Sequence, residues 1–288
     1  MRSISKFIQA LVVLIFGIIW LCVVSTTGAP WFFSLFGVIF ILIAAYIVIK
    51  AFVNRCPDLW SKYRDRHLKY AHSLVRTIDM KVLLINGSPH ENGCTYTSLR
   101  EVADTLEENG ISAEIHWIGK GEIIGCKACG YCKKNGRCVT DDDVNAISAR
   151  VDEFDGFVFG APVYYSGPAG QICTWMDRFF YVNSAKLAGK VGATVVNARR
   201  GGNSASFERL NQYYLISSMV VPGSQYWNIT HGSTPDDVKK DKEGLQTMRA
   251  LGRNMAWILK CIDLGKKAGL QVPDREPKIF TNFIMPKE

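Results

Sequence analysis

The chain has 288 residues, of which 48% are hydrophobic, and its formal net charge is +8. A mean hydropathy of +0.05 is too high for an ordinary water-soluble chain of this size, so we expect part of it to lie in lipid. The basic residues are not interleaved with aromatic ones as on a nucleic-acid-binding surface, and we expect no nucleic acid as a partner.

The N-terminal segment 1–53 predicts a transmembrane helical hairpin. Two runs without a charged residue, 7–27 and 31–49, are each long enough as a helix to cross a hydrocarbon core of roughly 30 Å. A cleaved signal peptide is the alternative for the first run, but its apolar stretch is longer than such peptides usually have. Lysine and arginine flank the pair and are absent from its turn, so we expect a two-span protein of the cell membrane with a cytoplasmic remainder.

Segment 54–79 is a basic juxtamembrane linker with several lysine and arginine residues. Its place after the second predicted span suggests contact with the anionic head groups of a lipid bilayer. A merely solvated linker remains the alternative.

From Met80 onward short apolar runs alternate with helical patterns, which predicts one α/β domain over 80–272, followed by a C-terminal tail, 273–288. We expect a doubly wound five-stranded parallel sheet, whose ligand lies beyond the carboxyl ends of the strands. The predicted strands are Lys81–Asn86, Ala113–Ile118, Gly156–Gly160, Val191–Asn197 and Met219–Val221. The predicted helices are Thr97–Asn109, Asp142–Phe154, Ala169–Val182, Ser204–Ser217 and Gly244–Leu270.

The loop after the first predicted strand, Gly87–Thr95, is rich in small and hydroxylated residues and leads directly into a helix. Backbone N–H groups at a helix N-terminus, aided by the helix dipole, can hold a phosphate. The loop is neither the glycine-rich dinucleotide fingerprint nor the lysine-containing nucleotide loop, which disfavours an NTPase. A simple surface loop is the alternative.

Four of the nine cysteines lie within thirteen residues, at Cys126, Cys129, Cys132 and Cys138. Structural disulfides are unusual in the cytosol. Zinc usually takes two cysteine pairs that are further apart, whereas overlapping C-x2-C steps are typical of ligands to an iron-sulfur cubane. A set of free, redox-reactive or structural thiols remains open. The neighbouring run Asp141–Asp143 is interpreted as a helix N-cap and acidic first turn.

The domain resembles the flavodoxin-like NAD(P)H-dependent FMN reductases, and within them the iron-sulfur flavoproteins. The resemblance rests on four motifs in the same order, KVLLINGSPHENGCT at 81–95, CKACGYCKKNGRCVTDDD at 126–143, DGFVFGAPVYYSGPAG at 155–170 with WMDR at 175–178, and NARRGG at 197–202. It covers most of 80–270 and leaves the predicted hairpin outside.

The resemblance implies the residues that hold the cofactors. The FMN phosphate would be held by Ser88, His90, Asn92 and Thr95, although family members often have Arg at the position of His90. The isoalloxazine ring would lie against two further loops, formed by Pro162, Val163, Tyr164, Tyr165 and Ser166 and by Asn197, Arg199, Arg200, Gly201 and Gly202. Cys126, Cys129, Cys132 and Cys138 would ligate a [4Fe-4S] cluster, and Asp177 and Arg178 would have only a structural role.

The activity implied is that of an FMN-dependent oxidoreductase that takes electrons from NAD(P)H, as co-substrate, and passes them to a quinone-like or other organic acceptor, with or without the cluster as intermediate. No protein residue need act as a nucleophile. The family also implies a homodimer or homotetramer. An electron carrier or redox sensor without a substrate of its own is the alternative.

Overall fold

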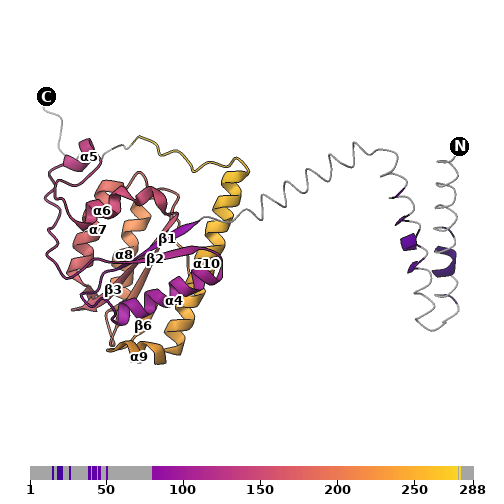
Figure 1. The fold of residues 1–288 in the computed structure, drawn as a ribbon, viewed down its shortest axis with the longest axis horizontal. Coiled ribbons are helices and arrows are strands. Elements are labelled where there is room, and N and C mark those ends of the chain that lie inside the picture. Colours follow the sequence, from indigo (N-terminus) through magenta and orange to yellow (C-terminus); the bar gives the residue numbers. More distant parts are fainter. Residues whose placement is uncertain are drawn as a thin grey trace. The chain divides into compact units, whose positions relative to one another are not determined.

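The computed structural model describes residues 80–277 and 279, together with isolated helical residues between Ile15 and Lys50. The contacts divide the chain into two units, Met1–Thr77 and Ile78–Glu288. The predicted linker, 54–79, and most of the predicted tail lie outside the described residues, and the division of the chain into four parts stays a prediction. The second unit carries the sheet (Figure 1), and it contains the four clustered cysteines.

The expected membrane location is corrected by the structure. A membrane crossing needs about 20 predominantly apolar helical residues, and no helix among the described residues meets that requirement of length and apolarity. The prediction of a two-span membrane protein with a cytoplasmic flavin domain is therefore wrong. The expectation of a lipid bilayer as partner rested on the same predicted spans and is not supported either. Most residues of the two predicted spans, 7–27 and 31–49, lie outside the described part.

The second unit is built on a parallel sheet in the order β2-β1-β3-β5-β6, with β4 paired only to β3, in an antiparallel hairpin. This is the doubly wound order in which the chain starts in the middle of the sheet and winds to both edges. The strands are β1 (Lys81–Asn86), β2 (Ser112–Trp117), β3 (Gly156–Tyr164), β4 (Gly167–Pro168), β5 (Val191–Ala198) and β6 (Ile229–His231).

Helices cover both faces of the sheet (Figure 1). One face packs against α6 (Asp143–Ala149), α7 (Gly170–Asn183) and α8 (Asn203–Ile216), and the other against α4 (Cys94–Glu108) and α10 (Lys242–Lys267). The short elements are α5 (Tyr131–Asn135), the 3-10 turn η1 (Val151–Glu153) and α9 (Pro235–Lys240).

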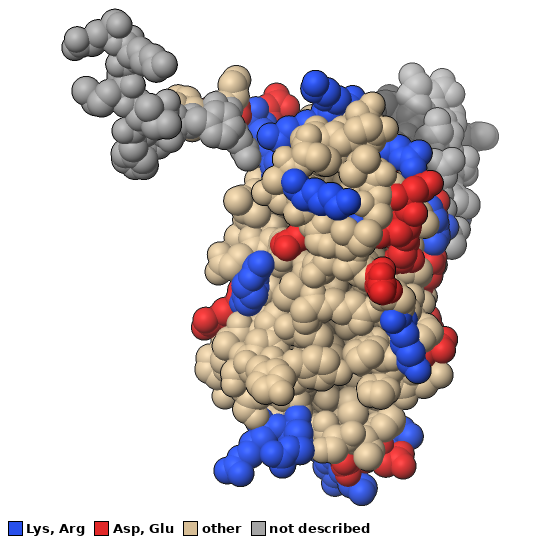
Figure 2. Space-filling model, turned by 90° about the vertical axis from the view of Figure 1, so that its left-hand side faces the viewer, with Lys and Arg blue, Asp and Glu red and all other residues tan. Residues whose placement is uncertain are grey.

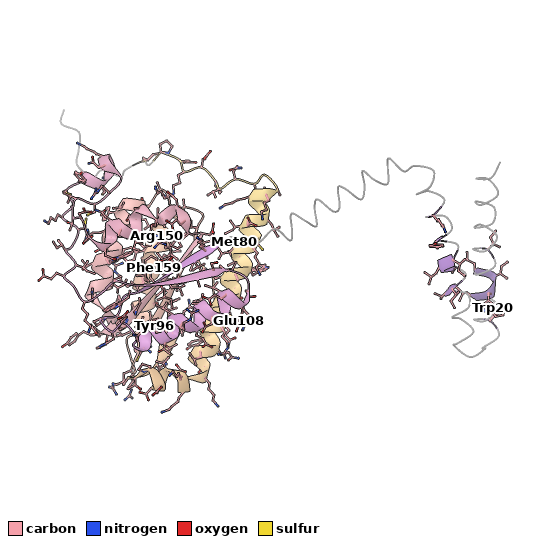
Figure 3. The ribbon with its side chains drawn as sticks, in the orientation of Figure 1. Trp20, Met80, Tyr96, Glu108, Arg150 and Phe159 are labelled. Atoms are coloured by element: carbon pink, nitrogen blue, oxygen red, sulfur yellow. The ribbon has the colours of Figure 1, made fainter. Side chains whose placement is uncertain are left out.

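Successive side chains of each strand point to opposite faces of the sheet, so the domain has two hydrophobic cores. In β1, Leu83 and Ile85 belong to the core under α7, while Val82 and Leu84 belong to the core under α4 and α10. Phe159 lies in the interior of the first core (Figure 3), where its ring is tilted against aromatic rings of α7 and α8. Buried on both faces, the central strands need continuous apolar runs, which explains why they were visible in the sequence.

Four of the five predicted strands are found, and the fifth was misplaced. β1 has the predicted bounds, and β3 runs four residues further than predicted, to Tyr164. The apolar run at Met219–Val221 contributes only an isolated bridge between Val220 and Val191. The edge strand is Ile229–His231 instead, which is three residues long and follows no apolar run.

One face of the second unit is shown in Figure 2, as seen from the left-hand side of Figure 1. Positive and negative side chains are interspersed around it, and a broad area in its middle carries few charged groups. Among the exposed apolar side chains of the second unit are Tyr181 on α7 and Leu215 and Ile216 at the end of α8.

Candidate functional site

The loop between β1 and α4 is braced by its own side chains. Asn86 Oδ1 accepts a hydrogen bond from the Ser88 amide at 3.1 Å, and Ser88 Oγ accepts one from the His90 amide at 3.1 Å. The indole N–H of Trp117, at the end of β2, donates to the Ser88 carbonyl at 2.8 Å. Ser88 is buried, while His90 and Asn92 are exposed at the rim.

Thr95, in the first turn of α4, has a buried hydroxyl without a protein partner. The residue is 1% exposed, and its Oγ1 makes no hydrogen bond. The N-cap residue Gly93 provides no side-chain cap to α4. A buried hydroxyl left unpaired costs about 1–3 kcal/mol, so a ligand oxygen here would recover that energy. Positive potential at a helix N-terminus and an orphaned donor both suit the phosphate of FMN.

A tight turn ends β3 and leads into β4. Tyr165 and Ser166 both have left-handed backbone angles, with φ of 50° and 62°, as in the two-residue turns that match hairpin twist. Tyr164 and Tyr165 are exposed at the tip, and Pro162 and Val163 are half-buried beneath them. The turn therefore holds an exposed aromatic tip beyond the carboxyl end of the central strand.

The loop after β5 packs against this hairpin. Gly202 has a φ of 88°, and a side chain there would place its Cβ 2.6 Å from the Cα of Ser166. Arg199, Arg200 and Gly201 are exposed. The two loops that the sequence assigned to the isoalloxazine ring are thus in direct contact at the carboxyl edge of the sheet.

Asn197, at the end of β5, is buried, and its amide is already engaged. Its Nδ2 donates to Thr230 Oγ1 at 3.0 Å, and Thr230 Oγ1 lies 2.7 Å from Ser98 Oγ. These hydrogen bonds join β5, β6 and α4 behind the loops. In this structure Asn197 ties the edge strand to the sheet, and the prediction that it contacts FMN stays a prediction.

Next to the β5 loop lies an open pocket of about 620 Å³. Arg200, Gly201 and Gly202 form one wall, and Tyr226 and His231 contribute to the rest of the lining. His231 Nδ1 lies 3.7 Å from an oxygen of Asp241, the N-cap of α10. A pocket of this size, lined by residues of a predicted flavin loop, can admit a second organic molecule.

The four clustered cysteines line a single, smaller pocket of about 180 Å³ around α5. Cys126 and Cys129 are exposed, and Cys132 and Cys138 are half-buried. All four are among the residues that line this pocket. In the part of the chain that the structure describes, no three Cys, His, Asp or Glu side chains group tightly enough to hold one metal ion. The role of the cysteines as ligands stays a prediction.

The backbone of Cys138 is fixed by a side chain of α6. Asn145 Oδ1 accepts from the Cys138 amide at 2.8 Å, and Asn145 Nδ2 donates to the Cys138 carbonyl at 3.0 Å. The amide group therefore mimics a strand partner and sets the direction of this one cysteine. Cys138 is the most firmly held of the four in its hydrogen bonding.

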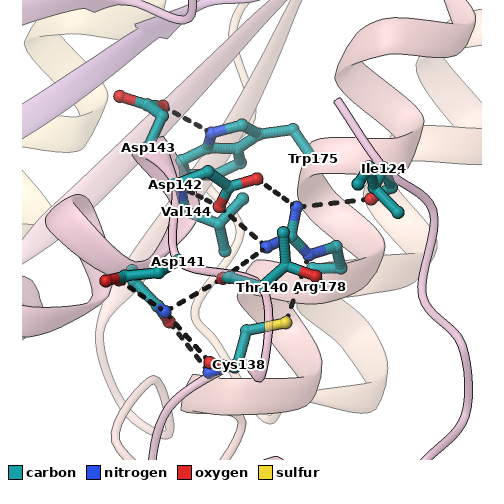
Figure 4. Close-up of polar contacts among 10 residues, drawn as sticks. Ile124, Cys138, Thr140, Asp141, Asp142, Asp143, Val144, Trp175 and Arg178 are labelled. Carbon is teal, nitrogen blue, oxygen red and sulfur yellow. Dashed lines mark hydrogen bonds and ion pairs between the residues drawn. The ribbon is translucent and has the colours of Figure 1, made fainter. Parts of the chain in front are cut away.

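Arg178 of α7 reaches the same cysteine from the interior (Figure 4). Its side chain is 1% exposed, and its Nε donates to Cys138 Sγ at 3.3 Å. Its two terminal nitrogens donate to the two carboxylate oxygens of Asp142 at 2.6 and 2.7 Å. They also donate to the carbonyls of Ile124 and Thr140. All five N–H groups of the guanidinium therefore have an acceptor.

The N-cap residue of α6, Asp142, and its first residue, Asp143, both form hydrogen bonds with side chains of α7. Asp142 caps α6 by accepting from the Val144 amide, as the sequence predicted, and it pairs with Arg178. Asp143 accepts from the indole N–H of Trp175 at 2.7 Å. Trp175 and Arg178 are one helical turn apart, so they face the same loop.

Burial acts to raise the pKa of the Cys138 thiol, but hydrogen bonds to the Thr140 backbone and to Arg178 outweigh it, and the pKa lies below its usual range. The pKa of Cys94, in contrast, is raised by burial. In the same way, burial holds the pKa of Cys173 above its usual range. The surroundings of Cys138 thus favour its thiolate form.

A doubly wound sheet with a phosphate-type loop and two further loops at its carboxyl edge defines a flavodoxin-like flavin-binding domain. A family model described as NADPH-dependent FMN reductase matches residues 80–234. The chain belongs to this family, which makes it an FMN-binding flavoprotein and an oxidoreductase.

Two curated relatives match this chain over nearly their full length. An iron-sulfur flavoprotein of Methanocaldococcus jannaschii is 35% identical over 191 residues, which are 64% of this chain and 99% of the relative. An iron-sulfur flavoprotein of Methanosarcina thermophila is 28% identical over 189 residues, 64% of this chain and 97% of the relative.

Solved structures agree on the fold. RosB with a bound formylriboflavin phosphate intermediate superposes with a TM-score of 0.51 at 13% identity, over 72% of this chain and 93% of its own. A flavone reductase superposes with a TM-score of 0.50 at 20% identity, over 64% of each chain. At these identities the likeness concerns the fold alone.

The sequence missed the contacts of Arg178, to which it assigned no chemistry. One signal was present, because Asp177 and Arg178 interrupt an otherwise apolar run from Trp175 to Phe180. Asp177 points outward, where it is 44% exposed and near Arg209, while Arg178 points inward. The prediction that the two do not pair with each other is confirmed.

Proposed function

We propose that the chain is an FMN-dependent oxidoreductase that takes electrons from a reduced nicotinamide and delivers them to an organic acceptor. The observation that carries the proposal is the unpartnered hydroxyl of Thr95 at the uncapped N-terminus of α4. Bound FMN would supply the hydride acceptance and the electron transfer that side chains cannot supply. The loop Ser88–Thr95 would hold its phosphate, with Thr95 as donor.

The remaining loop residues would orient the ring and limit access to it. The hairpin tip at Tyr164 and Tyr165 offers aromatic surface, and Arg199 and Arg200 add positive charge at the same edge. Positive charge near the ring would stabilise its anionic reduced form. The pocket beside Arg200 and Tyr226 would receive the nicotinamide or the acceptor, for which a quinone is the first compound to test.

We also propose that the cysteine pocket binds a [4Fe-4S] cluster. Four thiols line one pocket, and the relatives from two methanogens are named iron-sulfur flavoproteins. A cubane takes one thiolate at each iron, so its ligands need not converge on a single ion. The cluster would supply one-electron transfer. A homodimer or homotetramer remains part of the proposal, supported by the exposed Tyr181, Leu215 and Ile216.

The test is an anaerobic preparation of the full chain, reconstituted with FMN, iron and sulfide. We expect flavin absorption bands, about four iron per chain, and steady oxidation of NADH or NADPH when a quinone or azo dye is added. Cys132→Ser should lose iron and keep FMN. Cys261→Ser, on an exposed position of α10, is the matched control and should keep both.

Three results would each count against part of the proposal. A folded protein that fails to bind FMN would remove the flavin function. A flavoprotein whose flavin is reduced but does not turn over with any acceptor would be a carrier or sensor instead of an enzyme. Flavin without iron would remove the cluster alone.

A further inference from the structure

Arg178 is a buried cation whose surroundings are built for a negatively charged sulfur. Every N–H of its guanidinium is used, and four of the five contacts go to oxygen atoms of Asp142, Thr140 and Ile124. The fifth, from Nε, goes to Cys138 Sγ at 3.3 Å. A neutral thiol accepts hydrogen bonds weakly, whereas a thiolate, free or bound to iron, accepts them strongly.

The contact distinguishes Cys138 from the other three cysteines. In the described part of the chain, Cys126, Cys129 and Cys132 receive no side-chain hydrogen bond at sulfur, and Cys126 and Cys129 are exposed. Cys138 is fixed twice, through its backbone by Asn145 and through its sulfur by Arg178. One of the four thiols is therefore held in a different electrostatic environment from the rest.

From this geometry we infer that Arg178 is a positioning residue that raises the reduction potential of the cluster, an inference that rests on the cluster of the proposed function. Reduction adds one electron to the cluster and breaks no bond, so the cluster becomes more negative by one charge. Hydrogen bonds to ligand sulfur and a nearby cation stabilise that more negative state. Asp142 acts in the opposite sense, because its carboxylate partly cancels the charge of Arg178.

Because Arg178 and Asp142 carry opposite charges, the inference predicts that neutralising each of them shifts the midpoint potential of the cluster in opposite directions. The full chain, reconstituted with FMN, iron and sulfide, is titrated with dithionite in the presence of mediators, and the EPR signal of the reduced cluster is followed. Arg178→Gln should shift the midpoint potential to more negative values. Asp142→Asn should shift it to more positive values. A purely structural role would not give shifts of opposite sign.

Arg178→Lys is the second variant, because it keeps the charge and loses the planar fork and the Nε–H group. If Arg178→Gln does not fold, Arg178→Lys should still do so. If both fold, the midpoint potential of the cluster should fall by less in Arg178→Lys than in Arg178→Gln. Arg100→Gln is the charge-matched control. Arg100 lies on α4, on the other face of the sheet, and among the described residues it pairs only with Asp104 and Glu107. The cluster potential of this variant should equal that of the unchanged protein.

The outcomes separate the inference from the function on which it rests. An unchanged protein that binds FMN but no iron would remove the cluster and the inference together. An iron-loaded protein in which Arg178→Lys and Asp142→Asn keep the original potential, or shift it in the same direction, would overturn the inference and leave the cluster in place. If Arg178→Gln folds and binds FMN but not iron, the midpoint potential of Arg178→Lys is the test. A more negative potential supports the inference, and a more positive one overturns it.

Discussion

A substitution at Thr95 gives the most direct test of the proposal that the chain binds FMN. We expect Thr95→Val to remove one charge-assisted hydrogen bond to the phosphate, worth about 1.5–3 kcal/mol, and so to raise the Kd for FMN roughly 10- to 100-fold. The measurement is fluorescence titration of FMN into flavin-free protein. Without FMN, the variant should be no less stable than the original, because the hydroxyl has no protein partner to lose.

Thr105→Val is the matched control for this experiment. Thr105 is buried on the same helix, but its hydroxyl donates to the Glu101 carbonyl within α4. We expect its Kd for FMN to be unchanged. Equal effects of the two substitutions would show that Thr95 acts through helix packing and not through the phosphate.

At this scale the sequence predicted some roles and missed others. Thr95 was proposed for the phosphate from local features, because it follows a strand end and a small-residue loop, and this role stays a prediction. The hydrogen bond between Arg178 and Cys138 joins residues 40 positions apart, and nothing in the spacing of either residue indicates the other. A buried arginine is recognised only when its partner is known, since its charge must be paired to be buried.

Among the elements, the contact between the β5 loop and the β3–β4 hairpin depends on one glycine. Gly202→Ala should lower the free energy of unfolding by about 2 kcal/mol or more, because a side chain at a φ of 88° is strained and its Cβ would meet backbone atoms of Ser166. Urea unfolding measures this loss. We also expect weaker FMN binding, since the substitution would move both of the loops that are proposed to lie against the isoalloxazine ring.

Gly201→Ala provides the control one residue away. A Cβ there meets no atom within 4 Å, and its φ is not in the left-handed region. We expect a change within about 0.5 kcal/mol. A similar loss in both variants would mean that loop entropy, and not the contact with Ser166, determines the stability.

Two of the strands that the sequence predicted well are buried on both faces. Lys81–Asn86 and Val191–Asn197 are nearly continuous apolar runs, as central parallel strands require. The edge strand Ile229–His231 is short and is held by Thr230, which Asn197 and Ser98 bond from neighbouring elements. Because side-chain hydrogen bonds from other elements hold this strand, its own sequence need not contain an apolar run by which it could be predicted.

For the whole molecule, both hydrophobic cores lie between Met80 and Leu259. A chain that starts at Ile78, the first residue of the second unit, should therefore fold by itself and bind FMN as the full chain does. Circular dichroism during urea unfolding, at saturating FMN, should give the same midpoint for both chains. A lower midpoint or a lost transition for the shorter chain would show that residues 1–77 stabilise the domain.

The short helix α5 has a consequence for how the cysteine pocket is assembled. Its five residues lie between Gly130 and Gly136, both in the left-handed conformation, and none of them is buried. An isolated helix of this length gains too little from its own hydrogen bonds to offset the lost chain entropy. Asn145 and Arg178 hold Cys138, whereas α5 has no buried residue, so ligation by the thiols would restrict the segment 126–132 more than Cys138. The conformational entropy of Cys126–Cys132 then becomes part of the affinity for whatever the thiols bind.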